Sequence, residues 1–476
     1  MKIIKYLSAL FTVILLLTSG CDDYNKLTAP STGPVNGNAD FTRYVAIGNS
    51  ITAGYQSGTL FESAQMYSYG NLISQQVNTS FATPWISDPG LGGRLEVGSL
   101  SPFSIYTNPN SGVPTNLNYS APYNNLGVPG ALVYDVLFAT KSTDCASYIF
   151  AGVPNPYFDL ILRNSALNIG SQLSQALTLD PTLVTLWIGN NDVLGYATSG
   201  GTAPTSPTDA GQFAALFNGI AGTLAQAQVP VVVANIPNVT AIPFFTTVGP
   251  QMALSVPWTV SGAPGLVYQS STTVIGVADS TSLLTGGVLV TLKGSSYASL
   301  LGKPTGKFYR DNGISDPSIF GIDTTQLFGF SVGNPWPNAL ILDDGEITIA
   351  NDAVAAFNGA IATAAANFGF GLVDINGIFN SIRQNDFTGG TNYNGINFTT
   401  LYVTGGLFSL DGVHPSSRGQ AIIANEFIKV MNTKFSANIP LIDVSTIPGS
   451  IVLASKLNGN SNYFDIPAKV FEHLLF

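Results

Sequence analysis

Short apolar runs that alternate with longer helical stretches are the feature that most constrains how this 476-residue chain folds. The apolar runs cover residues 43–48, 182–188, 229–234 and 371–375. Helical stretches are expected over residues 207–228, 346–368 and 416–434. Strands that are apolar along their whole length are typical of parallel sheets covered by helices on both faces. The alternation therefore predicts an α/β fold with a mostly parallel sheet.

Two long segments rich in Gly, Pro, Ser and Thr interrupt this alternation, at residues 78–123 and 246–340. Loops of this length are uncommon in a compact domain, so we expect both to be insertions with structure of their own. The insertion that contains the second segment begins at about Ile242, with the sequence Ile-Pro-Phe-Phe, and carries Trp258 and Trp336. Its aromatic residues have two interpretations: an apolar wall or lid beside a binding site, or the core of the insertion itself.

The N-terminus predicts export. Lys2 and Lys5 precede an apolar run over residues 6–17, which suits a signal peptide and is too short to span a membrane as a helix. The run leads into Leu-Thr-Ser-Gly-Cys21, which resembles the lipobox of bacterial lipoproteins, where small residues precede a cysteine that is lipidated. We therefore expect residues 1–20 to be a lipoprotein signal peptide. The alternative is an ordinary secretory signal that happens to contain a cysteine.

The domain organisation follows from these signals. Residues 21–40 are rich in Pro, Gly, Ser, Thr and Asn, which predicts a flexible tether from a lipidated Cys21 to a domain over residues 41–440. Residues 441–476 form a C-terminal tail without recognisable chemistry. If Cys21 carries lipid, Cys145 has no partner for an intramolecular disulfide, so the domain must be stabilised by its core.

Charged residues are scarce in this chain. They make up 9% of it, against roughly 25% in an average soluble protein. The 17 Lys and Arg and 27 Asp and Glu residues give a net charge of −10. Such a chain is expected to repel phosphate-rich surfaces, so no nucleic-acid partner is predicted.

The chain has two histidines, so any histidine-dependent chemistry must use His414 or His473. His473 lies among the last few residues, where solvated chain ends are the default. His414 follows Asp411 by three residues, and this spacing can bring the carboxylate to Nδ1 and leave Nε2 free to act as a base. A purely structural hydrogen bond is the alternative. Two histidines without a cysteine cluster do not supply a zinc site, and no metal is predicted.

Three further segments place reactive or polar groups at strand ends and helix starts. Ser50 lies in Gly-Asn-Ser-Ile-Thr-Ala-Gly, directly after the first expected strand. Gly130 lies in Asn-Leu-Gly-Val-Pro-Gly, a turn that enters a helix, and Asn191 lies in Gly-Asn-Asn-Asp after the second strand. Parallel sheets bind ligands at this carboxyl edge. Together with Asp411 and His414, the segments supply a nucleophile, oxyanion donors, and a base with its orienting acid.

Taken in order, these four segments resemble the four sequence blocks of the SGNH hydrolases, also called the GDSL family of lipases and esterases. The resemblance covers roughly residues 41–436. It implies a three-layer α/β/α fold with about five mostly parallel strands in flavodoxin-like order. It also implies chemistry without a cofactor.

The resemblance implies a role for each site residue. Ser50 is the nucleophile and forms a triad with His414 and Asp411. The oxyanion hole consists of the backbone N–H groups of Ser50 and Gly130 and the side chain of Asn191. The chain departs from the family pattern at Asn49, where the family name implies Asp, and in the long separation between the third and fourth blocks.

The activity implied by the resemblance is that of a secreted, lipid-anchored serine esterase that cleaves carboxylic esters through an acyl-enzyme. Lipid esters, acetylated polysaccharides and small aromatic esters all remain open as substrates. The alternative is a surface lipoprotein that binds glycan or lipid on the same scaffold without turnover. The chain is similar to lipoproteins of Bacteroidetes, which favours the outer membrane, whereas Asp22 after Cys21 would signal inner-membrane retention in enteric bacteria.

Overall fold

A computed structural model of the chain describes residues 37–100, 103–203, 206–255, 258 and 265–449. The expected signal peptide, the lipidation site Cys21 and most of the expected tether lie outside the described residues, as does His473.

Five parallel strands form the central sheet, and their order confirms the predicted fold class. The strands are β1 (Tyr44–Gly48), β4 (Asn125–Gly127), β5 (Leu183–Trp187), β6 (Val231–Ala234) and β11 (Gly371–Val373). Their spatial order is β11-β6-β5-β1-β4, which is the flavodoxin-like order 2-1-3-4-5 read from the opposite edge. Every residue of β1, β5 and β6 is buried, as expected for strands that are apolar on both faces.

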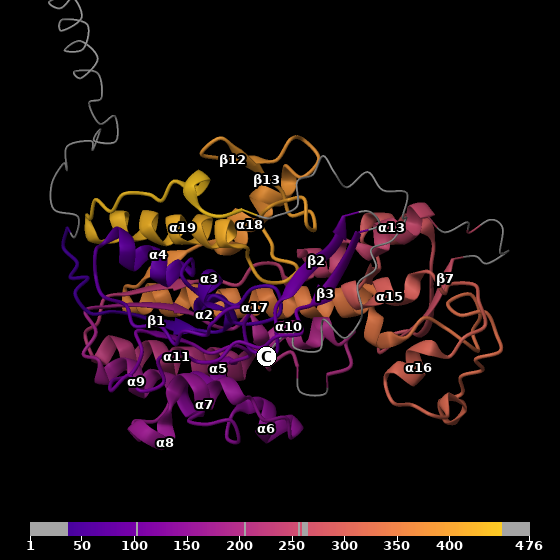
Figure 1. Cartoon of the computed structure of the whole chain (residues 1–476), viewed down its shortest axis with the longest axis horizontal. Coiled ribbons are helices and arrows are strands. Elements are labelled where there is room, and N and C mark those ends of the chain that lie inside the picture. Colours follow the sequence, from indigo (N-terminus) through magenta and orange to yellow (C-terminus); the bar gives the residue numbers. More distant parts are fainter. Residues whose placement is uncertain (1–36, 101–102, 204–205, 256–257, 259–264, 450–476) are drawn as a thin grey trace, which may run out of the picture.

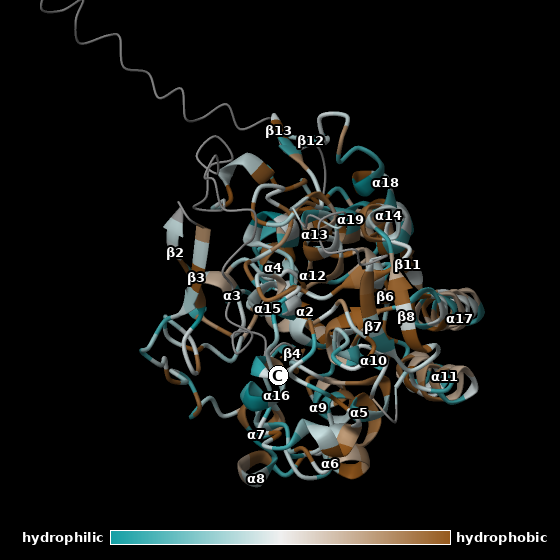
Figure 2. Ribbon diagram, turned by 90° about the vertical axis from the view of Figure 1, so that its right-hand side faces the viewer, coloured by the Kyte–Doolittle hydropathy of each residue, from teal (hydrophilic) through white to brown (hydrophobic). Residues whose placement is uncertain are grey.

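Helices cover both faces of this sheet (Figure 1). On one side α4 (Tyr69–Gln76) packs against α19 (Ser417–Phe435). On the other side α5 (Val133–Phe138) packs against α9 (Gln172–Thr178) and α11 (Ala210–Gln226), and α17 (Asp344–Phe368) packs against α11. In Figure 2, β6 is coloured as hydrophobic, whereas α11 and α17 carry both kinds of residue, as is usual for helices with one solvated face.

Shorter elements connect the main ones. The helices are α2 (Ser50–Ala53), α3 (Glu62–Gln65), α6 (Ala146–Ala151), α7 (Pro156–Leu162), α8 (Asn164–Leu167), α10 (Asn191–Thr198) and α12 (Pro243–Thr246). A hairpin of β12 (Thr391–Tyr393) and β13 (Ile396–Phe398) precedes α19.

The last strand of the sheet is shorter than expected. The apolar run over residues 371–375 predicts one strand, but β11 ends at Val373. The Asp374 side chain accepts a hydrogen bond from the backbone N–H of Gly377 at 2.9 Å and thereby caps helix α18 (Ile375–Gln384). Ile375 therefore belongs to a helix that the sequence analysis did not anticipate.

Both long segments contain secondary structure. Residues 78–123 include a hairpin of β2 (Leu95–Leu100) and β3 (Phe103–Thr107). Residues 246–340 include α13 (Val248–Ser255), the hairpin β7 (Leu266–Ser270) and β8 (Val274–Ala278), α14 (Ser280–Thr285), β9 (Leu289–Val290), α15 (Ser295–Ala298) and α16 (Lys307–Asp311). Strand β9 pairs with β10 (Ile341–Leu342), just beyond this segment.

The aromatic residues of the second segment pack against one another. Trp336 is fully buried, and its ring centroid lies 5.4 Å from that of Phe328. The ring centroid of Trp258 lies 5.6 Å from that of Phe330. For Trp258 and Trp336, the structure therefore favours the interpretation that they belong to an internal core of the insertion.

The described ends of the domain are held against α19. The backbone N–H of Asn38 donates to the carbonyl oxygen of Phe435 at 2.7 Å, so residues at the end of the expected tether are packed. The backbone N–H of Ile442 donates to Asn425 Oδ1 at 2.7 Å, which anchors the start of the tail. Among the described residues, no helix combines the length and the apolar character needed to cross a membrane.

Candidate active site

Ser50 lies where β1 turns into α2, at the carboxyl edge of the sheet. A side chain at Gly48 would place its Cβ 2.5 Å from the carbonyl oxygen of Trp187, so only glycine fits at the end of β1. The Asn49 side chain then caps α2 by accepting from the backbone N–H of Ile51 at 3.1 Å. Strand order reverses at β1, so Ser50 occupies the place where sheets of this topology bind ligands.

His414 and Asp411 approach Ser50 from the loop that precedes α19. The Nε2 atom of His414 lies 2.9 Å from Oγ of Ser50, and its Nδ1 atom lies 3.0 Å from Oδ2 of Asp411. All three residues are buried. The structure thus brings together three of the residues that the sequence analysis singled out, across 364 positions of sequence between Ser50 and His414.

Four hydrogen bonds hold the Asp411 carboxylate. Besides the His414 ring, it accepts from the backbone N–H groups of Val413 at 2.9 Å, His414 at 2.8 Å and Gly58 at 3.1 Å. Burial alone would raise the pKa of Asp411, but the charge on His414 and these hydrogen bonds outweigh it and hold the pKa below its ordinary value. Asp411 is therefore a carboxylate that can orient His414 and stabilise its protonated ring.

Two contacts around the histidine were missed by sequence reasoning. The ring centroid of Tyr55 lies 4.7 Å from that of His414, and Gly58 donates to Asp411 from the same segment. Neither residue belongs to a recognisable motif, and no signal in the sequence points to them.

The segments around Gly130 and Asn191 are joined to each other beside Ser50. The backbone N–H of Val128 donates to the carbonyl oxygen of Gly48 at 3.0 Å, and Asn191 Nδ2 donates to that of Ala131 at 3.0 Å. Gly130 has a φ of +79°, a conformation that favours glycine. Within the described chain, no acceptor is bonded to the backbone N–H of Ser50 or Gly130. The second Nδ2 hydrogen of Asn191 likewise has no acceptor among the described residues.

Asp192 also links the segment around Asn191 to the segment that follows Gly130. Its Oδ2 accepts from the backbone N–H of Val133 at 3.0 Å, and its Oδ1 accepts from the Thr208 hydroxyl at 2.8 Å. Burial raises the pKa of Asp192 to about 7, with a further contribution from the charge of Asp135. Asp192 thus holds the start of α5, three residues after Gly130.

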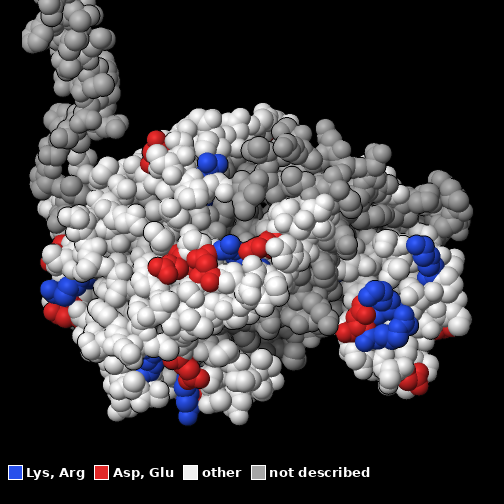
Figure 3. All heavy atoms as spheres, viewed as in Figure 1, with Lys and Arg blue, Asp and Glu red and all other residues white. Residues whose placement is uncertain are grey.

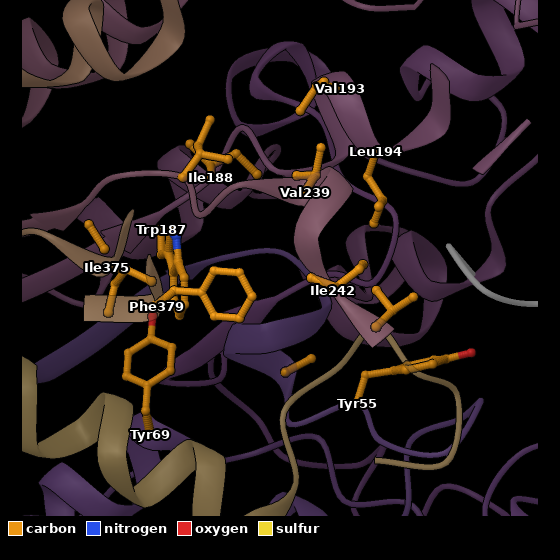
Figure 4. Close-up of a cluster of buried hydrophobic side chains, with 14 of the residues drawn as sticks. Tyr55, Tyr69, Trp187, Ile188, Val193, Leu194, Val239, Ile242, Ile375 and Phe379 are labelled. Carbon is orange, nitrogen blue, oxygen red and sulfur yellow. The ribbon is translucent and has the colours of Figure 1, made fainter. Parts of the chain in front are cut away.

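A largely apolar pocket opens beside Ser50 and His414. It is lined by Trp187, Leu194, Val239 and Ile242 together with residues from α18, α19 and the loop before α19. Figure 4 shows Trp187, Ile375 and Phe379 on one side of this region and Leu194, Val239 and Ile242 on the other. Asn191 also lines the pocket, so the nucleophile, the base and one candidate oxyanion donor share it.

The described residues contain no group of three or more His, Cys, Asp or Glu side chains that could hold a metal ion. The Cys145 thiol is buried, and its Sγ lies 3.2 Å from the carbonyl oxygen of Ser142.

Comparison with known proteins identifies the family. The GDSL-like lipase/acylhydrolase family matches residues 44–258 and 325–427, and the unmatched residues between them fall inside the second long segment. No curated relative matches the chain. A solved structure described as LAE5, an alpha/beta hydrolase enzyme from the metagenome of Lake Arreo, Spain, is similar over 83% of this chain and 96% of that chain, with 11% identity and a TM-score of 0.34. Because the family match covers well over half of the sequence, the chain belongs to the GDSL-like lipase/acylhydrolase family.

Proposed function

We propose that this protein is an exported, lipid-anchored serine esterase that hydrolyses carboxylic esters through an acyl-enzyme at Ser50. The observation that carries the proposal is the hydrogen-bonded chain from Ser50 Oγ through the His414 ring to Asp411, with successive distances of 2.9 and 3.0 Å. Membership in a family of lipases and acylhydrolases supports an ester as the substrate.

The reaction proceeds in two halves. Ser50 Oγ attacks the ester carbonyl carbon while His414 Nε2 takes the hydroxyl proton, and Asp411 stabilises the imidazolium that forms. The tetrahedral intermediate collapses when its bond to the alcohol oxygen breaks and His414 returns the proton to that oxygen. Water then attacks the acyl-enzyme with His414 again as the base, which releases the carboxylic acid and restores Ser50.

Three donors stabilise the negative oxygen of the tetrahedral intermediate in this proposal. They are the backbone N–H groups of Ser50 and Gly130 and the side-chain Nδ2 of Asn191. Donors fixed in advance within a buried site cost no reorganisation when the charge develops. The hydrogen bond from Asn191 to Ala131 and the hydrogen bond from Val133 to Asp192 keep the Gly130 and Asn191 donors in position.

The proposal places the enzyme in the cell envelope, on the outer membrane. Its basis is the N-terminal sequence, in which a short apolar run ends at Cys21. In this view lipid on Cys21 anchors the chain, and the catalytic domain faces the periplasm or the cell surface.

A fluorophosphonate probe tests the catalytic assignment directly, because it phosphonylates serines activated by a neighbouring base. Intact-mass spectrometry should find one adduct on the wild-type protein, mapped to Ser50, and none on Ser50→Ala. His414→Ala should react far more slowly. A folded wild-type protein that forms no adduct would contradict the esterase proposal and favour a lipoprotein that binds lipid or glycan without turnover.

A further inference from the structure

We infer that the pocket between α18 and α19 binds the acyl chain of the substrate, so that the enzyme prefers medium-chain acyl esters to acetyl esters. The inference rests on the proposed esterase function. It places the acyl chain against two helices of the hydrolase core and away from the 246–340 insertion, in which Trp336 packs against Phe328 and Trp258 against Phe330.

Each of the two helices lines the pocket with four residues that share one helix face. Helix α18 contributes Ile375, Ile378, Phe379 and Ile382. Helix α19 contributes Gly419, Ile422, Ile423 and Glu426. Both sets follow the spacing i, i+3, i+4, i+7, which puts each set on one helix face. Seven residues of helix rise by about 10 Å, so the apolar walls extend well beyond the space that an acetyl group fills. In Figures 1 and 2 the two helices lie side by side.

The polarity of the pocket changes along its length. At the Ser50 end the pocket is lined by the polar residues Asn49, Asn190 and Asn191. At the other end Ile378 and Glu426 also line an outer groove along β11 and α19. Glu426 forms an ion pair with Lys429 at 2.7 Å. An ester with its carbonyl at Ser50 and its alkyl chain between the helices matches this gradient.

The apolar walls also give a physical reason for chain-length preference. Each methylene that leaves water for an apolar pocket gains enough free energy to raise kcat/KM by up to about fourfold, provided the contact persists in the transition state. An acetyl group is too short to cover the residues of α18 and α19 that line the pocket. We therefore expect kcat/KM to rise from acetate towards octanoate.

Blocking variants test this inference with p-nitrophenyl acetate and p-nitrophenyl octanoate, which share one leaving group. Ile378 and Ile423 are half-buried and line the pocket from opposite helices, so Ile378→Trp and Ile423→Trp fill it from either side. Gln384→Trp is the matched control, because Gln384 is exposed on α18 and does not line the pocket.

The wild-type enzyme should hydrolyse octanoate with a kcat/KM at least about tenfold above that for acetate. Each blocking variant should lower the octanoate-to-acetate ratio of kcat/KM by about fivefold or more, while Gln384→Trp should keep the wild-type ratio. Blocking variants that keep the wild-type octanoate-to-acetate ratio would overturn the inference.

The same assay separates this inference from the proposed function. Hydrolysis that requires Ser50 but is fastest on acetate would overturn the acyl pocket and leave the esterase intact. Absence of Ser50-dependent hydrolysis on every ester would overturn both.

Discussion

Asp411 illustrates how single residues set the chemistry of this site. Each of its oxygens accepts two hydrogen bonds, so the carboxylate can rotate little and presents one fixed oxygen to the His414 ring. The ring in turn directs Nε2 at Ser50. The family name implies an acid at position 49, but Asn49 serves here as a helix cap, a role that Asn fills as well as Asp.

Asn191→Ala tests the oxyanion assignment. Loss of one donor should lower kcat by about 10²- to 10³-fold with little change in KM, because the donor acts mainly on the transition state. Asn425→Ala is the control, since Asn425 is also buried and bonded to backbone, at Ile442, but does not line the pocket. It should lose stability and keep kcat. Equal kcat in wild type and Asn191→Ala would remove Asn191 from the oxyanion hole.

Asp135 should make stability depend on pH. Burial raises its pKa to about 7, well above that of an unfolded Asp, although the backbone N–H groups of Leu132 and Ala146 bond to it. The folded state therefore holds the proton more tightly, and this stabilising contribution is complete below about pH 4 and is lost as pH rises towards 7.

Urea unfolding at pH 4.5 and 7.5 measures this effect by comparing the wild type with Asp135→Asn, which cannot titrate. The stability advantage of the wild type should shrink by on the order of 2 to 4 kcal/mol between the two pH values. An advantage that is equal at both would show that Asp135 ionises normally in the folded protein.

At the residue scale, the sequence allowed prediction of the side chains that meet at this site, but not of the residues that hold them in place. Ser50 and His414 stand out through scarcity and motif. Tyr55 and Gly58 contact His414 and Asp411 from more than 350 positions away in sequence, and nothing local marks such contacts.

At the scale of secondary structure, helices with a long periodic pattern and strands with a continuous apolar run are predicted closely, whereas elements without either signal are not. The helix expected over residues 416–434 is α19, and the strand expected over 43–48 is β1. Strand β4 was read as a turn because it has three residues and a single bulky apolar side chain. Helix α18 was missed because its first residue, Ile375, continues the apolar run of β11. The pocket wall that α18 provides was missed with it.

Phe328→Ala tests whether the 246–340 segment has a structural role only. Phe328 is buried against Trp336, so its loss should cost about 3 to 5 kcal/mol of unfolding free energy. The octanoate-to-acetate ratio of the folded variant should stay at the wild-type value, because Phe328 does not line the pocket beside Ser50. A changed ratio would indicate that the insertion contacts the acyl chain of the substrate.

At the scale of the whole molecule, sheet topology explains why residues so distant in sequence meet. All five strands are parallel, so their carboxyl ends share one edge, and the segments after β1, β4 and β5 converge there with the loop before α19.

Most of the face in Figure 3 carries no charge, and where Lys and Arg occur they mostly lie beside Asp and Glu.

Cys21→Ser tests the anchor on the whole chain. When the chain is expressed with its own leader in a bacterium that processes lipoproteins, the wild type should sediment with membranes and dissolve in detergent, whereas the variant should stay in the aqueous fraction. Cys145→Ser is the matched control and should sediment like the wild type, because Cys145 is buried in the domain. Identical fractionation of wild type and Cys21→Ser would contradict lipidation at this residue.

Whether Ser50 is the nucleophile of an esterase is measured by kcat/KM on p-nitrophenyl butyrate for the soluble form that starts near Asp22. Ser50→Ala should lower it by at least about 10³-fold, with an unchanged unfolding midpoint. Ser280→Ala, at an exposed serine of α14, should leave it unchanged. A Ser50→Ala protein that hydrolyses the ester at the wild-type rate would show that Ser50 is not the nucleophile.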